Sequence, residues 1–297
     1  MELRHLRYLI AAAETGSLTE AAERRLYTSQ PSLSRQIRDL ESEVGVELLS
    51  RSVRGVEPTL AGKAFLDHAR LALLHVDAAV EAARRAAQPE RKSFAIGFQT
   101  GHEMTWLTPA MQLLHDELTE IEVTVSSDYS PDLAEALARG RLDLAFMRIE
   151  SGYDLEYHVV DREPLIVLMP SDHRLTAHSC VNPQDVVGEV FIGGSNKAAV
   201  LHAITEDYFR RSGLDIELTH GVDNLAMAMS LVASTRGVAL LPEYAKNLLP
   251  PSVVSRPLQG EAPTIEIAVG YSKANPSPVL ELFVARLDEL VRLNQRV

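Results

Sequence analysis

The stretch from residue 59 to residue 87 most constrains how this chain can fold. It contains no proline and one glycine, Gly62, and it starts at Thr59, a favourable helix cap, directly after Pro58. Apolar side chains recur in it at spacings of four and three residues: Phe65, Ala69, Ala72, Val76, Ala79 and Ala83. This spacing is typical of a coiled-coil seam. The pattern predicts a long linker helix that dimerises; an amphipathic helix packed on its own domain remains the alternative.

The charge differs on the two sides of this helix. Residues 1–92 hold 14 Lys and Arg against 13 Asp and Glu, whereas residues 93–297 hold 15 against 28. The acidity therefore belongs to the second part, which indicates two domains with different tasks. Cys180 is the only cysteine, which excludes an internal disulfide and a cysteine-rich zinc site. The first residues do not form a signal peptide and no stretch resembles a membrane span, so we expect a cytoplasmic protein without membrane contact, metal or cofactor.

Three helices precede the linker helix. The first runs from about residue 2 to residue 15 and ends at Gly16, and Ser17 with Glu20 forms a capping box for the second. The third begins with the cap Ser29 and Pro31 in its first turn, and it ends at Gly45. The segment 48–58 has short apolar pieces around arginines and a glycine, which predicts a small hairpin.

The outward face of the third helix carries groups suited to DNA. With its leucines turned inward, this face presents hydroxyls, amides and arginines, which hydrogen-bond base edges or grip phosphates. Its N-terminus would enter a major groove, and the hairpin arginines would hold the flanking backbone as a wing. The predicted DNA-binding residues are Ser29, Gln30, Pro31, Ser32, Ser34, Arg35 and Arg38 on the helix, and Arg51 and Arg54 on the hairpin.

Beyond residue 92, buried strands alternate with helices. Strands are predicted at 94–98, 121–125, 142–147, 165–169 and 238–241, and helices at 106–118 and 132–139. This alternation predicts an α/β domain with a parallel sheet.

The sequence also resembles a known family. The runs LTEAAERRL (residues 18–26) and SQPSLSRQIRDLE (residues 29–41) resemble the helix-turn-helix signature of LysR-type transcriptional regulators. The resemblance continues through TLAG (59–62), GRLDLA (140–145) and GVALLP (237–242), and it covers essentially the whole chain. The segments 144–148 and 153–157 look similar to regulators of aromatic-acid degradation.

The resemblance implies an N-terminal all-α winged helix-turn-helix, a long linker helix and a C-terminal regulatory domain similar to periplasmic binding proteins. The domains would be 1–58 (DNA-binding), 59–92 (linker and dimerisation) and 93–297 (effector-binding), the last with subdomain I at 93–161 and 267–297 and subdomain II at 162–266. It further implies a homodimer or homotetramer that binds an interrupted inverted repeat in double-stranded DNA near a promoter and responds to a small-molecule inducer. Contact with RNA polymerase is another implied partnership.

The effector site is expected beyond the carboxyl ends of the strands. There the loops offer hydroxyls, helix N-termini and an arginine, which favour an anionic ligand, with an aromatic carboxylate as first choice. The candidate effector residues are Thr100, Gly101, His102, Ser127, Ser130 and Arg148, with Asn196 and His202 on the facing subdomain; in resembling regulators the matching loops line the cleft.

Two other functions would each explain only part of the sequence. An enzyme is disfavoured because no phosphate-binding glycine loop, metal-spaced histidine pair or nucleophile elbow occurs in the sequence, so no catalytic residue is proposed. A ligand-binding protein without a DNA role would account for residues 93–297 but would leave the helix-turn-helix pattern and the linker unexplained.

Overall fold

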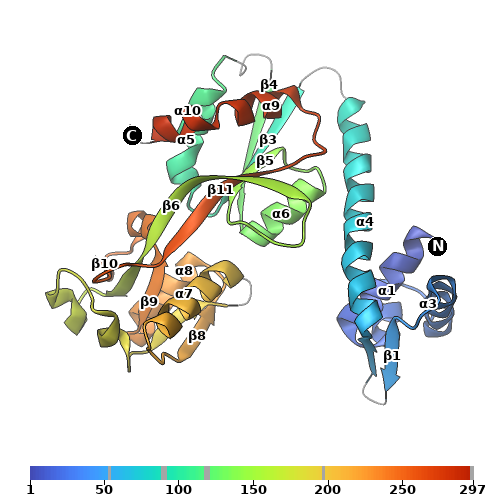
Figure 1. Cartoon of the computed structure of the whole chain (residues 1–297), viewed down its shortest axis with the longest axis horizontal. Helices are drawn as coiled ribbons and strands as arrows, with labels where there is room; N and C mark the ends of the chain where they lie inside the picture. Colours follow the sequence, from blue (N-terminus) through green and yellow to red (C-terminus); the bar gives the residue numbers. More distant parts are fainter. Residues whose placement is uncertain (53–54, 88–91, 117–120, 196–197, 295–297) are drawn as a thin grey trace. The chain divides into compact units, whose positions relative to one another are not determined.

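The computed structural model describes residues 1–52, 55–87, 92–116, 121–195 and 198–294 (Figure 1). The chain divides into two compact units: the first comprises Met1–Pro89 with Ala138–Arg141, and the second comprises Glu90–Leu137 with Leu142–Val297.

The N-terminal unit is a small helical domain with a two-stranded hairpin. Its elements are α1 (Leu3–Thr15), α2 (Leu18–Glu20) continuing into a π-helical turn (Ala21–Arg25), α3 (Gln30–Val44), β1 (Leu49–Ser52), β2 (Gly55–Pro58) and α4 (Leu60–Ala86). Its core is formed by buried side chains from each part, among them Leu9, Leu18, Leu33, Ile37, Leu40, Leu48, Val56 and Leu66. The predicted helices and hairpin are therefore present.

The helix ends follow the predicted caps, with one difference. Gly16 and Gly45 take left-handed conformations after α1 and α3, with φ of 65° and 85°. The Ser17 hydroxyl accepts a hydrogen bond from the Glu20 N–H at 3.3 Å, but the reciprocal half of the predicted capping box does not form. The carboxylate of Glu20 instead pairs with Arg24 at 3.0 Å, and the Ser17 N–H donates to Thr15 Oγ1. Ser17 is thus a simple cap.

Gly62 lies at a close approach between α4 and the loop before β1. A Cβ atom at this position would lie 1.9 Å from the carbonyl oxygen of Leu48. Thr59 holds the same junction, because its hydroxyl donates to the carbonyl of Glu47 at 2.8 Å and accepts from the Gly62 N–H at 2.9 Å. Gly62, which by sequence alone would only weaken the helix, is required for this contact.

Helix α4 is buried at its start and exposed towards its end. Phe65 and Leu66 pack in the core of the N-terminal unit. Ala79 and Ala83, the last two residues of the predicted seam, are exposed, and so is Val80, at 45%. The single chain therefore leaves the end of the seam uncovered. The dimerising role of this helix stays a prediction.

The C-terminal unit contains, within its described residues, a nine-stranded sheet flanked by helices. The sheet order is β4-β3-β5-β11-β6-β9-β7-β8, with β10 paired to β6. The strands are β3 (Lys92–Gln99), β4 (Ile121–Asp128), β5 (Leu144–Met147), β6 (Leu155–Pro170), β7 (Phe191–Gly194), β8 (Leu218–Val222), β9 (Val238–Pro242), β10 (Val253–Pro257) and β11 (Thr264–Ser272). The main helices are α5 (Glu103–Leu113), α6 (Ser130–Ala138), α7 (Ala199–Arg211), α8 (Leu225–Thr235), α9 (Pro278–Ala285) and α10 (Leu287–Asn294).

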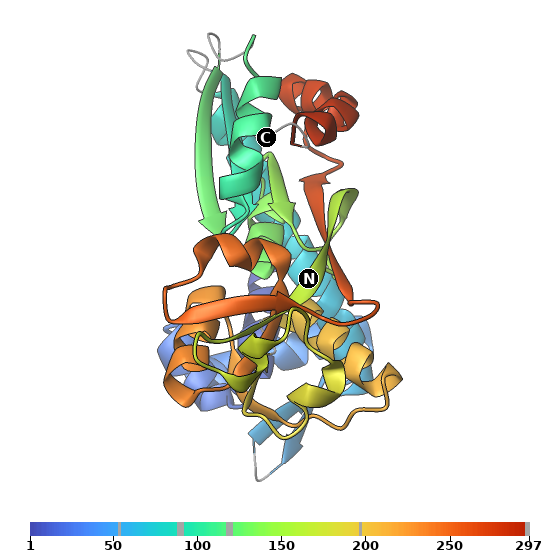
Figure 2. The ribbon, with the colours of Figure 1, turned by 90° about the vertical axis from the view of Figure 1, so that its left-hand side faces the viewer.

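This sheet is mixed, whereas the sequence predicted a parallel one. β3, β4 and β5 are parallel to one another, and so are β7, β8 and β9, but β6, β10 and β11 pair antiparallel with their neighbours. The difference arises because β6 is 16 residues long and runs, beside β11, from one group of strands to the other (Figures 1 and 2). Only its second part, around residues 165–169, has the apolar run from which the sequence predicts a strand.

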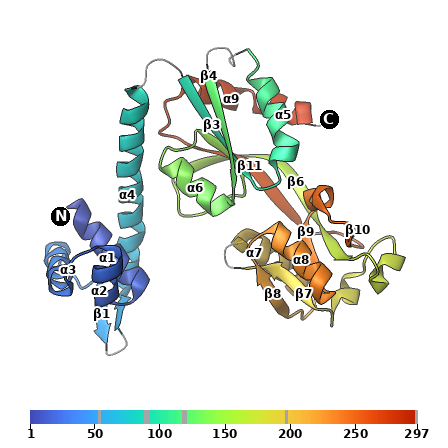
Figure 3. The same ribbon diagram turned by 180° about the vertical axis from the view of Figure 1, so that it is seen from behind.

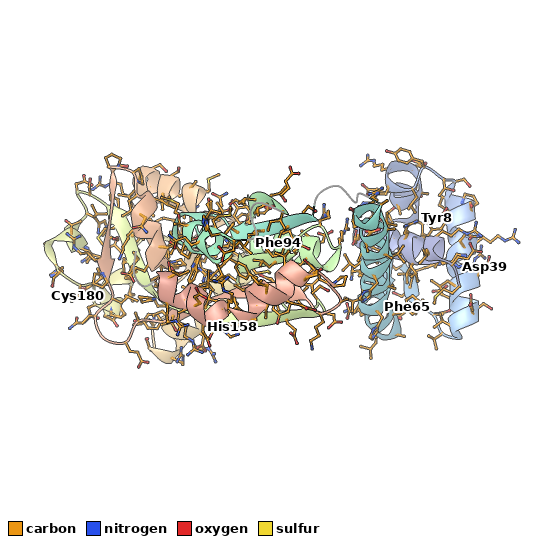
Figure 4. The ribbon with its side chains drawn as sticks, turned by 90° about the horizontal axis from the view of Figure 1, so that it is seen from above. Tyr8, Asp39, Phe65, Phe94, His158 and Cys180 are labelled. Atoms are coloured by element: carbon orange, nitrogen blue, oxygen red, sulfur yellow. The ribbon has the colours of Figure 1, made fainter. Side chains whose placement is uncertain are left out.

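The C-terminal unit thus has two halves joined by β6 and β11. In the first half, β3, β4, β5 and helices α5, α9 and α10 surround an aromatic core that includes Phe94, Trp106, Phe146 and Phe283. Helix α6 packs in a separate apolar cluster with Leu142 and Met147. Phe94 is labelled in Figure 4. In the second half, α7 and α8 lie beside β7 and β8 (Figure 3). β6 changes its pairing from β11 to β9 at Pro164 and Leu165.

Candidate functional sites

The outward face of α3 is largely exposed, as a DNA-reading surface requires. Ser29, Pro31, Ser32, Arg35 and Arg38 are exposed and Gln30 is half-buried. The Ser29 hydroxyl caps the helix by accepting from the Ser32 N–H at 3.4 Å. Because the first N–H groups of a helix and two arginines share this face, it suits phosphates and base edges.

Ser34 lies elsewhere than the sequence placed it. It is 6% exposed, because the helix turns it towards the hairpin rather than onto the outward face. Its hydroxyl accepts a hydrogen bond from Arg51 Nη1 at 3.0 Å, and its carbonyl accepts from Arg38 Nε at 3.2 Å. Ser34 therefore joins α3 to the hairpin arginine. Arg54, the other predicted wing residue, lies outside the described residues.

Glu41 fixes the hairpin against α3. Its Oε1 accepts hydrogen bonds from the backbone N–H groups of Leu48 and Leu49 at 2.9 and 3.0 Å. This carboxylate holds the start of β1, which places Arg51 beside the helix.

Tyr27 is a surface residue that sequence reasoning missed. It is 89% exposed and has a φ of 50°, a conformation that is uncommon outside glycine. It lies in the turn just before the cap of α3. The sequence feature that could have indicated it is a large aromatic residue in the turn of the helix-turn-helix.

The C-terminal unit contains a pocket of about 360 Å³ lined by both halves. Its walls are mostly apolar: Val200, Leu201, Val222, Leu225, Met229, Leu241, Leu248 and Ile265. Tyr129 and Tyr244 add aromatic rings to the lining. An apolar cavity of this size with a few polar groups is typical of a small-molecule site.

Three helix N-termini border this pocket. Ser130 and Pro131 begin α6, Ala199 begins α7, and Leu225 begins α8, and all four residues line the cavity. Ala198, which precedes α7, makes no side-chain cap, so among the described residues no N-cap side chain satisfies the first N–H groups of α7. Exposed N–H groups at helix N-termini favour a negatively charged ligand group.

The structure brings together some of the predicted effector residues and not others. Thr100, Ser130 and Arg148 line the pocket. Gly101, His102 and Ser127 do not; His102 is buried behind the pocket, and Ser127 is exposed beside Thr100, 3.4 Å between their hydroxyl oxygens. His202 borders a separate hollow and lies 3.8 Å from the carboxylate of Glu206. Asn196 lies outside the described residues.

Ser130 connects the ends of two strands, β3 and β5, at the pocket. Its hydroxyl donates to Gln99 Oε1 at 2.5 Å and accepts from the Arg148 N–H at 2.8 Å. This places the start of α6 against the ends of β3 and β5.

Arg148 is less available to a ligand than the sequence suggested. Its guanidinium donates to the carbonyl of Glu266 at 2.6 Å and lies 3.5 Å from Glu163. Burial lowers the pKa of Arg148 from its usual range, against the opposing charge of Glu163. The sequence could not show these contacts, because Glu163 and Glu266 lie on the crossing strands β6 and β11.

A buried cluster lies behind the pocket. His102 Nε2 is 2.8 Å from Glu163 Oε1, and Tyr244 donates its N–H to Glu163 and its hydroxyl to the carbonyl of Thr100. Burial lowers the pKa of His102, which outweighs the hydrogen bond to Glu163. Burial alone would raise the pKa of Glu163, but the hydrogen bond from His102 and the charge of Arg148 lower it. The stable state is therefore a neutral imidazole beside an ionised carboxylate.

An N-terminal helix-turn-helix with a hairpin wing, followed by a pocket-bearing α/β unit, defines the class of ligand-responsive DNA-binding regulators. Within the described residues, no helix has the length and apolar character needed to cross a membrane. The same residues contain no group of three or more potential metal-binding side chains.

Comparisons with known proteins agree with this class. The model for the bacterial regulatory helix-turn-helix protein of the lysR family matches residues 3–63, and the model for the LysR substrate binding domain matches residues 87–292. The chain is 34% identical over 291 residues to the Hca operon transcriptional activator HcaR of Escherichia coli, covering 97% of this chain and 98% of that protein. It is 31% identical to the regulator BenM of Acinetobacter baylyi over 84% of this chain and 82% of that protein.

Solved structures show the same fold. Full-length BenM superposes with a TM-score of 0.56 at 27% identity, covering 99% of this chain and 96% of that one. Full-length CbnR in complex with its target DNA gives a TM-score of 0.56 at 24% identity, with 98% and 100% coverage. The chain belongs to the LysR family of transcriptional regulators. It is an effector-responsive DNA-binding regulator and not an enzyme.

Proposed function

We propose that this regulator binds an interrupted inverted repeat near a promoter through α3 and the hairpin, and that an aromatic carboxylate in the C-terminal pocket switches promoter activity. In this proposal residues 1–58 read DNA, 59–92 dimerise, and 93–297 sense the effector as two subdomains. The assembly is a homodimer or homotetramer, and RNA polymerase is a partner at the promoter.

The DNA part of the proposal is supported by the exposed face of α3. Ser29, Ser32 and Arg35 lie on its N-terminal half, and Arg51 is held beside it through Ser34. Base contacts would come from the helix and phosphate contacts from the hairpin.

The observation that carries the ligand part is the meeting of three helix N-termini at one apolar pocket. Their N–H groups would hold a carboxylate, while the leucine, valine and tyrosine walls would pack on an aromatic ring. Arg148 would support this arrangement mainly through the backbone that it holds.

The DNA part is tested by gel shift and footprinting on the DNA upstream of the gene and its divergent neighbour, at stated salt. Protection of two half-sites separated by an interruption supports it. Absence of specific protection, with and without aromatic acids, contradicts it.

The ligand part is tested by calorimetry of the full chain with benzoate, phenylacetate and cinnamate and with ring-substituted forms of each. Ser130→Ala should weaken binding, because it removes the bonds to Gln99 and Arg148, and should leave DNA affinity unchanged. Unchanged ligand affinity in this variant removes Ser130 from the site.

A further inference from the structure

Glu150 is a carboxylate on the wall of the pocket that has no role in the binding of a ligand carboxylate. It follows β5 two residues after Arg148, and both residues line the cavity. Ile149, between them, is 42% exposed and does not line it. This alternation is expected of extended backbone, in which residues two apart face the same side about 7 Å from each other.

The backbone of Glu150 is held in place. Its carbonyl accepts a hydrogen bond from the hydroxyl of Tyr157 on β6 at 3.1 Å, and its N–H lies 3.4 Å from the same oxygen. The side chain therefore leaves a fixed point of the pocket rim, as a residue that selects ligands requires.

The carboxylate of Glu150 has no protein partner among the described residues. No donor there bonds to it and no cation lies within ion-pair distance, whereas the other charged residues of the lining are engaged. Arg148 is bonded to Glu266 and Glu163, and Asp223 accepts from Ser195. Burial raises the pKa of Glu150 from its ordinary value.

A carboxylate in this setting gains most from a ligand that donates a hydrogen bond to it. It would repel a ligand carboxylate, which would then lie at the helix N-termini of the pocket, away from Glu150. We propose that Glu150 selects effectors that carry a hydroxyl or ammonium group at the end opposite their carboxylate. The effector class is thus a hydroxy- or ammonium-substituted aromatic acid; this inference rests on the proposed carboxylate site.

The experiment is calorimetric titration of the full chain with matched acids. Benzoate is compared with 4-hydroxybenzoate and 4-(aminomethyl)benzoate, phenylacetate with 4-hydroxyphenylacetate, and cinnamate with 4-hydroxycinnamate. For at least one pair the substituted acid should bind about ten-fold or more tightly than the parent, the range of a charge-assisted hydrogen bond. Comparison of the hydroxyl-substituted with the aminomethyl-substituted acid shows which hydrogen-bond donor the pocket prefers.

Variants assign the preference to the carboxylate. Glu150→Ala should abolish it for both donors. Glu150→Gln has nearly the same shape and keeps an acceptor oxygen, so it should lose most of the ammonium preference and retain part of the hydroxyl preference. Glu122→Gln, at an exposed residue of β4 outside the pocket lining, is the control and should keep the full preference.

The outcomes distinguish a wrong role for Glu150 from a wrong ligand class. Equal affinity of parent and substituted acids for the unaltered protein, or a preference that survives in both Glu150 variants, overturns the role of Glu150 and leaves the carboxylate site standing. If none of these acids binds, the proposed ligand class is wrong and the inference falls with it. Thermal unfolding and DNA gel shift of Glu150→Gln establish that the variant is folded.

Discussion

Arg35 and Ser34 are neighbours on α3 with opposite environments. Arg35 is exposed on the outer face, whereas Ser34 is buried and accepts a hydrogen bond from Arg51. Helical geometry explains the contrast, because consecutive residues are 100° apart around the axis. The helical pattern predicts an outward Arg35, which is exposed; the burial of Ser34 arises from the hairpin, a tertiary contact that the helical pattern does not contain.

We expect Arg35→Ala to weaken specific DNA binding about ten-fold or more, because an arginine that contacts a base edge contributes about 1–3 kcal/mol. Gel shifts at one salt concentration measure this loss, and calorimetry should show unchanged effector binding. Arg210→Ala, at an exposed arginine of α7, serves as the control. Equal DNA affinity of Arg35→Ala and the control would remove Arg35 from the interface.

Only some of the residues that line the pocket could be predicted from the sequence. Thr100, Ser130 and Arg148 were predicted because they follow apolar strands, where ligands of α/β folds bind, and all three line the pocket. Glu150 and Tyr244 were missed, since their positions depend on β6 and on the turn after β9. Gly101, His102 and Ser127 lie in the same loops as lining residues but do not line the pocket.

At the scale of elements, the junction of α4 with the hairpin depends on a backbone contact. Gly62→Ala places a Cβ atom where the Leu48 carbonyl lies, so either α4 or the hairpin must shift. We expect a loss of about 1–3 kcal/mol in the free energy of unfolding of the N-terminal unit, as in overpacked cores.

Gly45→Ala is the comparison for this prediction. Among the described residues, no atom lies within 4 Å of the place that a Cβ of residue 45 would take, but Gly45 has a φ of 85°. Its loss of stability should therefore be confined to the conformational cost, about 1 kcal/mol. Denaturant unfolding followed by circular dichroism measures both variants. If the Gly62→Ala protein is as stable as the unaltered one, the junction between α4 and the hairpin can shift without loss of stability.

The end of α4 carries the second prediction at this scale. Ala79 and Ala83 are exposed and lie on the predicted seam. Ala79→Glu with Ala83→Glu should convert a dimer into monomers at micromolar concentration, because like charges would face each other across the seam. Light scattering after gel filtration gives the mass. His75→Glu, exposed on the same helix and off the seam, should leave the mass unchanged.

Signals within a few residues of each other in the sequence predicted most helices and strands. The arrangement of the sheet instead depends on pairing between strands that are far apart in the sequence. Gly16, Ser29, Gly45 and Thr59 end or begin helices because their cap chemistry acts within a few residues. The mixed sheet could not be predicted in this way. The first part of β6 is partly polar, and its antiparallel pairing with β11 joins residues about a hundred positions apart.

At the scale of the whole molecule, the buried cluster of His102, Glu163, Arg148 and Tyr244 links stability to pH. The ordinary pKa of histidine is 6.5, and that of His102 is lower, so below about pH 6.5 the unfolded chain binds a proton that the folded chain does not. Stability from this group is thus lost as pH falls below 6.5. Glu163, whose pKa is lowered, adds a further loss at more acidic pH.

The measurement is thermal unfolding at pH 7.5 and pH 5.5, followed by the fluorescence of Trp106, which is the only tryptophan and is 1% exposed. The midpoint temperature of unfolding should be lower at pH 5.5 than at pH 7.5. The difference should be smaller in His102→Gln, because glutamine does not titrate. Glu103, the other charge that acts on His102, is unchanged in both proteins. An equal fall in both would assign the pH dependence to other groups.

The last helices of the chain complete the core of the first half. Phe283 of α9 is fully buried against Phe94 and Phe146, and Arg286 donates to the carbonyl of Leu113 on α5 at 2.7 Å. During synthesis the N-terminal unit and most of the second half emerge before these residues do. On the ribosome, the core side of strands β3 to β5 therefore stays exposed until α9 and α10 have been synthesised. A chain released before that point would expose this apolar surface to chaperones and proteases.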